Sequence, residues 1–262
     1  MNLDLTGKRA LVCGSSQGIG LAAAVELAQL GCTVVLFARD RGRLETAQKQ
    51  LPTPSKQQHQ ILVADFTDSA AVVRALDAWM AENGGFEIVV NNSGGPPAGA
   101  VLAADIPQFL AAFENHLVVN QLIAQRVVPY MQRQRFGRIV NVISTSVKQP
   151  IHGLGVSNTI RGAVASWAKT LSAEVAPFGI TVNNVLPGAT RTARLDSILE
   201  GSAAKSKISV SDAEQKMLGP IPAGRFAEPS EIGAAIAFLA SPAAGYITGI
   251  NLPVDGGRTQ CL

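Results

Sequence analysis

Short apolar runs and longer amphipathic stretches alternate along the whole chain. The short runs are rich in β-branched residues and apolar at most positions, which is typical of strands buried on both faces of a sheet. They predict strands over residues 9–13, 33–37, 61–64, 88–90, 138–143, 181–185 and 251–254. The longer stretches predict helices over residues 19–30, 41–51, 69–82, 106–134, 158–175 and 230–239.

This rhythm of strand, helix and strand implies right-handed crossovers and a parallel sheet with helices on both faces. No internal repeat or long linker divides the chain, so we expect a single α/β domain over residues 1–262. The least regular stretch, residues 187–224, is rich in Ser, Ala, Gly and Lys. Because functional loops often have such sequences, we predict that it forms a mobile lid over a substrate instead of part of the core.

Composition narrows the function classes. Apolar residues make up 47% of the chain and charged residues 16%, and the net charge of +3 is spread along it, so neither nucleic acid nor an anionic membrane is indicated as a partner. No apolar run approaches the roughly 18 residues that cross a bilayer, and residues 1–8 lack the apolar stretch of a signal peptide. Cys13, Cys32 and Cys261 have no metal-binding spacing, and their odd number argues against a disulfide framework. We therefore expect a cytoplasmic protein without a metal.

A glycine-rich loop, Gly14-Ser15-Ser16-Gln17-Gly18-Ile19-Gly20, joins the first predicted strand to the first predicted helix. Glycines there let backbone N–H groups approach a pyrophosphate at the positive end of a helix, although a purely structural turn also needs glycine. The strand before the loop, the helix after it and the second strand about 20 residues on favour a dinucleotide site. The pattern predicts a doubly wound Rossmann fold with cofactor contacts at Gly14, Ser16, Gln17, Gly18, Ile19 and Gly20.

The end of the second predicted strand indicates which dinucleotide binds. An acidic residue there would bind ribose hydroxyls, whereas arginine suits the 2′-phosphate of NADP. The strand ends at Arg39-Asp40, and Arg41 and Arg43 follow. Arg41 and Arg43 also fit a solvated helix N-terminus, so the prediction of NADP(H) depends on Arg39, whose guanidinium can pair with phosphate through two hydrogen bonds.

Further motifs follow in a fixed order: Asn91-Asn92-Ser93-Gly94, Gly137-Arg138-Ile139-Val140-Asn141 and Val254-Asp255-Gly256-Gly257. Together with the glycine spacing, they resemble the short-chain dehydrogenase/reductase family across nearly the whole chain, most of all its 3-oxoacyl-carrier-protein-reductase-like members. The resemblance implies an adenine contact at Asp65, beside Phe66, and cofactor contacts at Asn92, Ser93, Gly94, Pro187, Gly188 and Thr192. It also implies a homo-oligomer, a tetramer or dimer, in which the helices of residues 106–134 and 158–175 pair between subunits.

The catalytic positions depart from that family's pattern. In the family that the chain resembles, a tyrosine supplies or accepts the proton, a lysine lowers the tyrosine pKa and holds the ribose, and a serine polarises the substrate oxygen. Ser144 matches the serine, but Ser157 and Arg161 stand where the tyrosine and lysine are expected. A serine hydroxyl is a far weaker acid than a phenol, and Arg161 can bind ribose but cannot relay a proton.

Two histidines are alternative proton donors because histidine titrates near neutral pH. His116 falls where the family has an asparagine that orders a relay water, and His152 precedes Ser157 by five residues. Each also has a structural explanation, as a hydrogen-bonded histidine within a helix and as a loop residue respectively. Both interpretations stay open at the level of sequence.

Two functions are compatible with these features. The first is an NADP(H)-dependent oxidoreductase that reduces a carbonyl or oxidises an alcohol on a small or acyl substrate, with the candidate catalytic residues Ser144, Ser157, Arg161 and His116. The second is a non-catalytic NADP(H)-binding sensor or assembly protein, since a fold does not prove its commonest function. The polar set of Ser144, Ser157 and Arg161 favours the enzyme.

Overall fold

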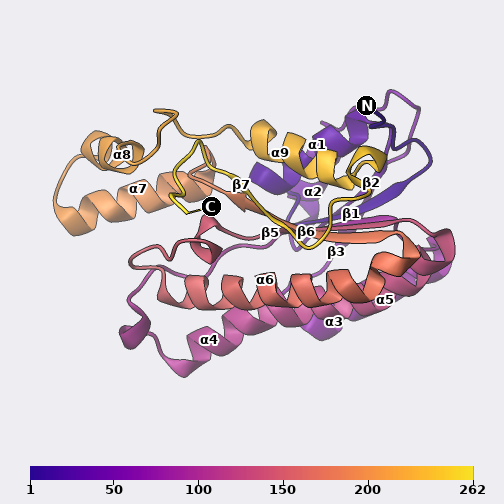
Figure 1. The fold of residues 1–262 in the computed structure, drawn as a ribbon, viewed down its shortest axis with the longest axis horizontal. Helices are drawn as coiled ribbons and strands as arrows, with labels where there is room; N and C mark the ends of the chain where they lie inside the picture. Colours follow the sequence, from indigo (N-terminus) through magenta and orange to yellow (C-terminus); the bar gives the residue numbers. More distant parts are fainter. Residues whose placement is uncertain (262) are drawn as a thin grey trace.

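A parallel sheet runs through the middle of the molecule, and helices cover both of its faces (Figure 1). The computed structural model describes residues 1–261. Within them, seven strands lie in the order β3-β2-β1-β4-β5-β6-β7. The strands are β1 (Arg9–Cys13), β2 (Thr33–Ala38), β3 (Gln60–Val63), β4 (Ile88–Asn91), β5 (Gly137–Val142), β6 (Ile180–Pro187) and β7 (Asn251–Val254). The predicted doubly wound α/β fold is confirmed, and the strand order changes direction between β1 and β4, where such folds bind ligands.

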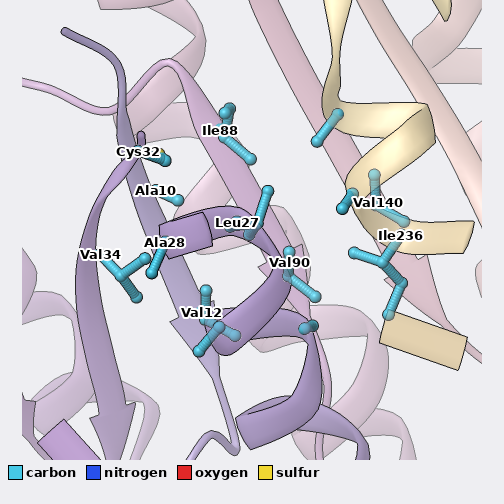
Figure 2. Packing of buried hydrophobic residues seen from close by; sticks show 14 of the residues in the cluster. Ala10, Val12, Leu27, Ala28, Cys32, Val34, Ile88, Val90, Val140 and Ile236 are labelled. Carbon is cyan, nitrogen blue, oxygen red and sulfur yellow. The ribbon is translucent and has the colours of Figure 1, made fainter. Parts of the chain in front are cut away.

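One face of the sheet is covered by α1 (Gly18–Gln29), α2 (Arg41–Gln48) and α9 (Pro229–Ala240). Figure 2 shows part of this core, where Leu27 of α1 and Ile236 of α9 lie among strand residues such as Val90. The first and last of these helices pack directly together, because a Cβ on Gly233 would lie only 2.9 Å from the backbone of Ala22.

The opposite face is covered by α3 (Ser69–Asn83), α5 (Val119–Gln134) and α6 (Gly155–Val175). Their buried side chains include Leu76, Ile123 and Ala168, which pack on the other side of the strands. No helix among residues 1–261 combines the length and apolar character needed to span a lipid bilayer.

The helix predicted over residues 106–134 is interrupted. The structure has α4 (Ile106–Phe113), then a π-helical segment η2 (Glu114–Val118), and then α5. The continuous amphipathic pattern hides this change because a π-turn inserts a residue without breaking the chain of hydrogen bonds. The segment carries His116 on its buried side, and such π-turns often occur at functional sites.

Residues 187–224, the least regular stretch of the sequence, contain two helices that the residue pattern did not predict. These are α7 (Ala193–Ser206) and α8 (Val210–Leu218), which extend from one end of the molecule (Figure 1). The two helices have a small apolar cluster of their own, which includes Leu195, Leu199 and Phe226. Thr192 and Ser209 cap them by accepting hydrogen bonds from backbone N–H groups, so the helix signals were present in the sequence.

Candidate active site

The glycine-rich loop between β1 and α1 adopts a backbone that only glycine accommodates. Gly14 and Gly18 have φ values of +58° and +59°, in the left-handed region. A Cβ on Gly14 would lie 2.6 Å from the backbone oxygen of Asn92, and a Cβ on Gly20 would collide with the carbonyl of Gly14. The close approach of these backbones explains both glycines and places the loop at the carboxyl ends of β1 and β4.

The start of α1 is open to an anion. Gln17 is its N-cap residue, and its side chain makes no capping hydrogen bond within residues 1–261. Ser16, Gln17, Gly18 and Ile19 all reach solvent, whereas Ser15 is fully buried. The backbone N–H of Phe37 donates to the Ser15 hydroxyl at 2.9 Å, which ties the loop to β2. This structural role of Ser15 was not predicted, because the sequence does not distinguish a serine that supports the loop from one that binds a ligand.

Asn92 and Ser93 extend the loop's support from β4. The Asn92 side chain donates to the carbonyls of Gly14 at 3.2 Å and Cys13 at 3.4 Å. The Ser93 hydroxyl lies 2.7 Å from Nδ1 of His116. Both side chains are thus engaged with the protein itself, and Gly94 begins the loop that follows.

The residues predicted to bind the adenosine end lie together at the ends of β2 and β3. A guanidinium nitrogen of Arg39 is 3.6 Å from a carboxylate oxygen of Asp65, and 75% of the Arg39 side chain is exposed. Hydrogen bonds from the backbone N–H and the hydroxyl of Thr67 help to lower the pKa of Asp65, although burial opposes them. Phe66 contacts the edge of Phe37 with ring centroids 5.0 Å apart. Arg43, by contrast, pairs with the helix-capping Asp40 at 3.4 Å, as a solvated helix N-terminus would.

The loop after β6 faces the glycine-rich loop. A Cβ on Gly18 would lie 3.3 Å from the methyl group of Thr192, so the two predicted cofactor segments meet. Gly188 is equally confined, because a Cβ there would lie 2.8 Å from the backbone of Asp255. Pro187 ends β6 just before this turn.

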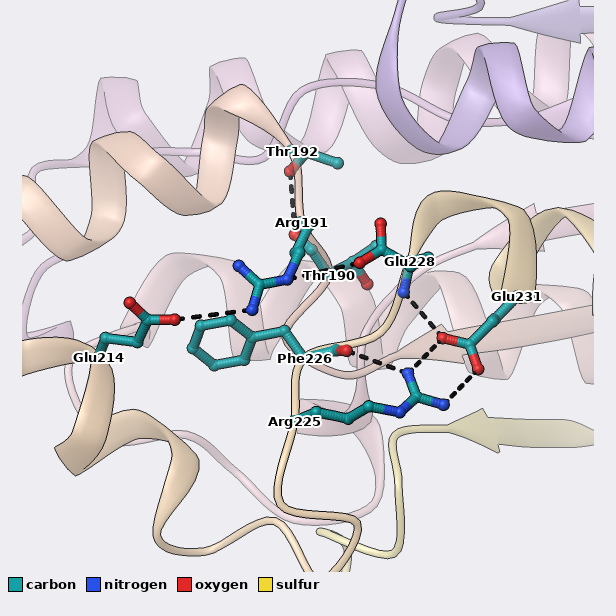
Figure 3. A network of polar contacts seen from close by, with 8 residues as sticks. All are labelled: Thr190, Arg191, Thr192, Glu214, Arg225, Phe226, Glu228 and Glu231. Atoms are coloured by element: carbon teal, nitrogen blue, oxygen red, sulfur yellow. Dashed lines mark hydrogen bonds and ion pairs between the residues drawn. The ribbon is translucent and has the colours of Figure 1, made fainter. Parts of the chain in front are cut away.

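Ion pairs fasten the loop after β6 to α8 and α9 (Figure 3). The Arg191 guanidinium lies 3.4 Å from Glu228 and 3.7 Å from Glu214, and it stacks over the ring of Phe226 at 5.5 Å. Nearby, both terminal nitrogens of Arg225 donate to Glu231 at 2.7 Å. These contacts fix the start of α7 relative to the end of the sheet.

One of the candidate catalytic residues, Ser144, follows β5, and two others, Ser157 and Arg161, lie in the long helix α6. Ser144 stands at the N-terminus of a short 3₁₀ turn, η3 (Thr145–Val147), and its hydroxyl accepts from the N–H of Ser146 at 3.1 Å. Ser157 is half-buried in the first turn of α6. One α6 turn further, Arg161 is only 8% exposed and donates from Nη1 to the carbonyl of Val142 at 2.8 Å.

Arg161 remains a cation although it is buried. Burial and the nearby charge of Arg194 lower the pKa of the Arg161 guanidinium to about 10. That pKa still leaves it protonated at neutral pH. Its Nε has no hydrogen-bond partner among residues 1–261, which is costly for a buried charged group.

His116 is neutral in this environment. Burial, and secondarily the positive charge of Arg161, lower the pKa of His116 to about 3. The neutral ring can hold the Ser93 hydroxyl, but it carries no additional proton to give at neutral pH. His152 is exposed on the loop before α6 and lines a different cleft from His116.

Two clefts flank these residues. The first, of about 330 Å³, is lined by Thr145, Gln149, Pro150, Ile151, His152, Pro220, Arg258, Thr259 and Gln260. The second, of about 440 Å³, lies between the loop after β4 and α4 and is lined by Gly94, Gly95, Pro96, Pro97, Asp105, Pro107, Gln108, Ala111, Ala112, Asn115 and His116.

A row of four asparagines lies beneath the site, and the sequence analysis missed it. Asn91, Asn141, Asn184 and Asn251 occupy one row across β4, β5, β6 and β7. The first three side-chain amides each donate to the side-chain oxygen of the next asparagine at 2.8 Å. The signal was a polar residue toward the carboxyl end of several apolar strands, and only the strand register reveals that the four align.

Comparisons with known proteins agree with this geometry. A family model described as Enoyl-(Acyl carrier protein) reductase matches residues 14–259. The chain is 29% identical over 259 residues to the NADPH-dependent reductase BacG of Bacillus subtilis (strain 168), covering 98% of this chain and 100% of that protein. It is 32% identical over 257 residues to the 3-oxoacyl-(acyl-carrier-protein) reductase FabG of Vibrio harveyi, covering 97% and 98%. The crystal structure of L-sorbose reductase from Gluconobacter frateurii, complexed with NADPH and L-sorbose, superposes with a TM-score of 0.93 at 28% identity and full coverage of both chains.

Proposed function

We propose, since this chain belongs to the short-chain dehydrogenase/reductase family, that it is an NADP(H)-dependent oxidoreductase that reduces a carbonyl or oxidises an alcohol on a small or acyl substrate. The observation that carries the proposal is the uncapped first turn of α1. The loop that leads into it contains glycines, Gly14 and Gly20, at which a Cβ would collide with the backbone. Such a helix start is suited to a pyrophosphate.

NADP(H) is the cofactor, and the residues of the site fit it. The loop of Gly14, Gly18 and Gly20 would hold the pyrophosphate, Asp65 would lie against the adenine, and Arg39 would bind the 2′-phosphate. Arg39 is mostly exposed and touches Asp65 at one nitrogen only, so it has donors left for a phosphate. Bound there, NADPH supplies a hydride to a carbonyl carbon.

The protein's own contribution is to bind and polarise the substrate oxygen. Ser144 and Ser157 would donate hydrogen bonds to it, and the buried charge of Arg161 would stabilise the negative charge that develops there. Because His116 is neutral and arginine keeps its proton, the proton would come from water through the serine hydroxyls. Ser93 and His116 then act by holding the loop after β4 in place.

The segment of residues 187–224 would serve as a substrate lid formed by α7 and α8. Their small apolar cluster allows the two helices to move as a unit, while Arg191 and Arg225 anchor the base of the segment. The lid would then move about this anchored base, beside Thr192, which would contact the cofactor.

The protein would also form a homo-oligomer. Exposed apolar side chains gather at the start of α4 and in the turn before it, η1 (Val101–Ala103). They are Val101, Leu102, Ile106, Leu110 and Phe113, with Leu102 97% exposed. Contiguous exposed apolar side chains on a protein surface are typical of a site that contacts another protein.

A panel assay distinguishes the proposed enzyme from the alternative, a non-catalytic NADP(H)-binding sensor. The missing tyrosine favours the sensor. NADPH is mixed with the protein and a series of ketones, 3-oxoacyl thioesters and quinones, and nicotinamide absorbance is followed. We expect turnover that Ser144→Ala lowers by about 10²- to 10³-fold, the usual loss for a donor to a developing oxyanion. Tight NADPH binding without turnover, and without gain in a Ser157→Tyr plus Arg161→Lys variant, would instead identify a sensor.

A further inference from the structure

We propose that Arg161 and Arg194 together bind a carboxylate of the substrate, so that the enzyme acts on small oxo acids or the corresponding hydroxy acids. The inference deepens the function proposed above and presupposes its carbonyl chemistry. It rests on one observation: the guanidinium groups of Arg161 and Arg194 both lie close to Gly95, and neither forms an ion pair within residues 1–261.

Gly95, in the loop after β4, marks the meeting point. A Cβ built on Gly95 would lie 3.6 Å from Nη2 of Arg161 and 3.9 Å from Nη2 of Arg194. Arg161 belongs to α6 and Arg194 to α7, so the two guanidinium groups approach the loop from different helices. Gly95 therefore leaves room at a point that both cations face.

Neither cation is neutralised by the protein. Arg161, which is buried, and Arg194, which is exposed, form no ion pair within residues 1–261. Arg161 is more than nine-tenths buried, and its Nε is without a partner in the same part of the chain. Two like charges held close together in a partly buried site repel each other, and a bound anion would relieve that repulsion.

The meeting point lies at the second cleft. Gly95 and Pro96 line that cleft, and Arg194 donates from Nη2 to the carbonyl of Pro96 at 3.0 Å. Asp105 is the only carboxylate among the lining residues, and it is engaged in capping α4 through the N–H of Gln108 at 2.9 Å. On its other side Arg161 is bonded to Val142, two residues before Ser144. Arg161 thus connects the proposed anion position to the end of β5, the strand that Ser144 follows.

A carboxylate suits this site better than a phosphate of the cofactor. The pyrophosphate has its own site at the open start of α1, whereas Arg194 belongs to α7, beyond Thr192. The two oxygens of a carboxylate can each accept from a different guanidinium, with charge-assisted hydrogen bonds. The adjoining cleft of about 440 Å³ is lined by Gly95 and Pro96 but by neither arginine, and its volume is at the lower end for ligand sites, which favours a small acid.

The test compares phenylglyoxylate with its methyl ester, which has the same ketone but no charge. Binding of each to the purified full chain is measured by calorimetry, with and without NADPH, for the parent protein and for Arg194→Gln and Arg194→Lys. Lys205→Gln is the matched control, because it removes the same charge from an exposed side chain in the last turn of the same helix, α7.

We expect the parent protein to bind the acid at least about tenfold more tightly than the ester, the effect of one charge-assisted hydrogen bond. Arg194→Gln should remove most of this preference by weakening acid binding alone, Arg194→Lys should keep part of it, and Lys205→Gln should keep it all. NADPH affinity should be the same in each variant.

Equal affinity for acid and ester in the parent protein, or an equal loss of both in Arg194→Gln, would overturn the inference. A loss of NADPH affinity in Arg194→Gln without an acid preference would assign the two arginines to a cofactor phosphate and also overturn it. An Arg194-dependent acid preference in a protein that fails to bind NADPH would leave the carboxylate site standing and refute the proposed function instead.

Discussion

At the scale of single residues, buried polar groups decide what the site can do. Arg161 has a fixed charge where the family places a titratable lysine, and Ser157 offers a hydroxyl where the family places a phenol. The change moves the chemistry from proton donation by a tuned acid toward electrostatic stabilisation by a cation. His116 stays uncharged beside that cation, because burial and like charge both oppose its protonation.

The neutral state of His116 makes a prediction about stability and pH. The pKa of about 3 in the folded protein lies below the ordinary value of 6.5, so the unfolded chain binds more protons between these pH values. The contribution of neutral His116 to the free energy of unfolding is therefore fully present above about pH 6.5 and is lost as the pH falls toward 3. In urea unfolding measured from pH 7 to pH 4, His116→Gln should show a shallower loss of stability than the parent, by up to about 1.4 kcal/mol per pH unit. Parallel pH profiles would refute this origin of the acid sensitivity.

The asparagine row predicts a contrast between two buried substitutions. Asn141 is fully buried and bonds to both Asn91 and Asn184, so Asn141→Ala should destabilise the fold by about 2–4 kcal/mol by leaving both neighbours with unmet hydrogen bonds. The hydroxyl of Thr181 is buried without a partner within residues 1–261, and Thr181→Val should be neutral or stabilising. Denaturant unfolding of both variants checks the pair, and similar losses would contradict it.

At the scale of elements, the sequence predicted each strand of the sheet but not all of the helices. The strands are short, rich in β-branched residues and apolar at most positions, so their signal does not depend on the surroundings. The helices α7 and α8 were missed because Ser, Gly and Lys fill their exposed faces, although Leu195, Leu199 and Ala203 recur at helical spacing. The π-turn η2 was beyond sequence analysis, since its residues fit an ordinary helix equally well.

The apolar cluster under α7 and α8 predicts where local flexibility begins. Phe226 is 1% exposed and packs against both helices' shared core, so Phe226→Ala should remove about 3–5 kcal/mol of packing from that unit. Hydrogen exchange should accelerate in α7 and α8 while the amides of β5 remain protected. Uniform acceleration across the sheet would show that the two helices do not form a separate unit.

At the scale of the whole molecule, the sequence identified the fold and both ends of the proposed cofactor site. The residue pattern and the order of motifs located the loops of Gly14–Gly20 and Pro187–Thr192, because turns of glycine at strand ends are local signals. The pairing of Arg161 with Arg194 was not predictable, since it depends on how α6 and α7 meet around Gly95. Contacts between distant segments come from packing, which periodicity does not encode.

The exposed apolar group on η1 and α4 predicts an assembly that one substitution disrupts. Leu110→Glu places a charge among these side chains, so it should shift the protein toward a monomer without lowering its unfolding temperature by more than a few degrees. Ile198→Glu makes the same change on α7, where the side chain is 40% exposed, and should leave the assembly intact. Light scattering after size exclusion measures both, and a monomeric parent protein would refute the oligomer.

The contact between α1 and α9 affects how the chain is made in the cell. Because α1 is synthesised early and α9 late, the part of α1 that packs against α9 stays uncovered while most of the protein leaves the ribosome. Nascent chains in that state are prone to aggregate, so chaperones would protect them until the last helix docks through Gly233. Premature termination before this helix would leave the same part of α1 permanently bare, and the shortened product would be cleared by proteolysis.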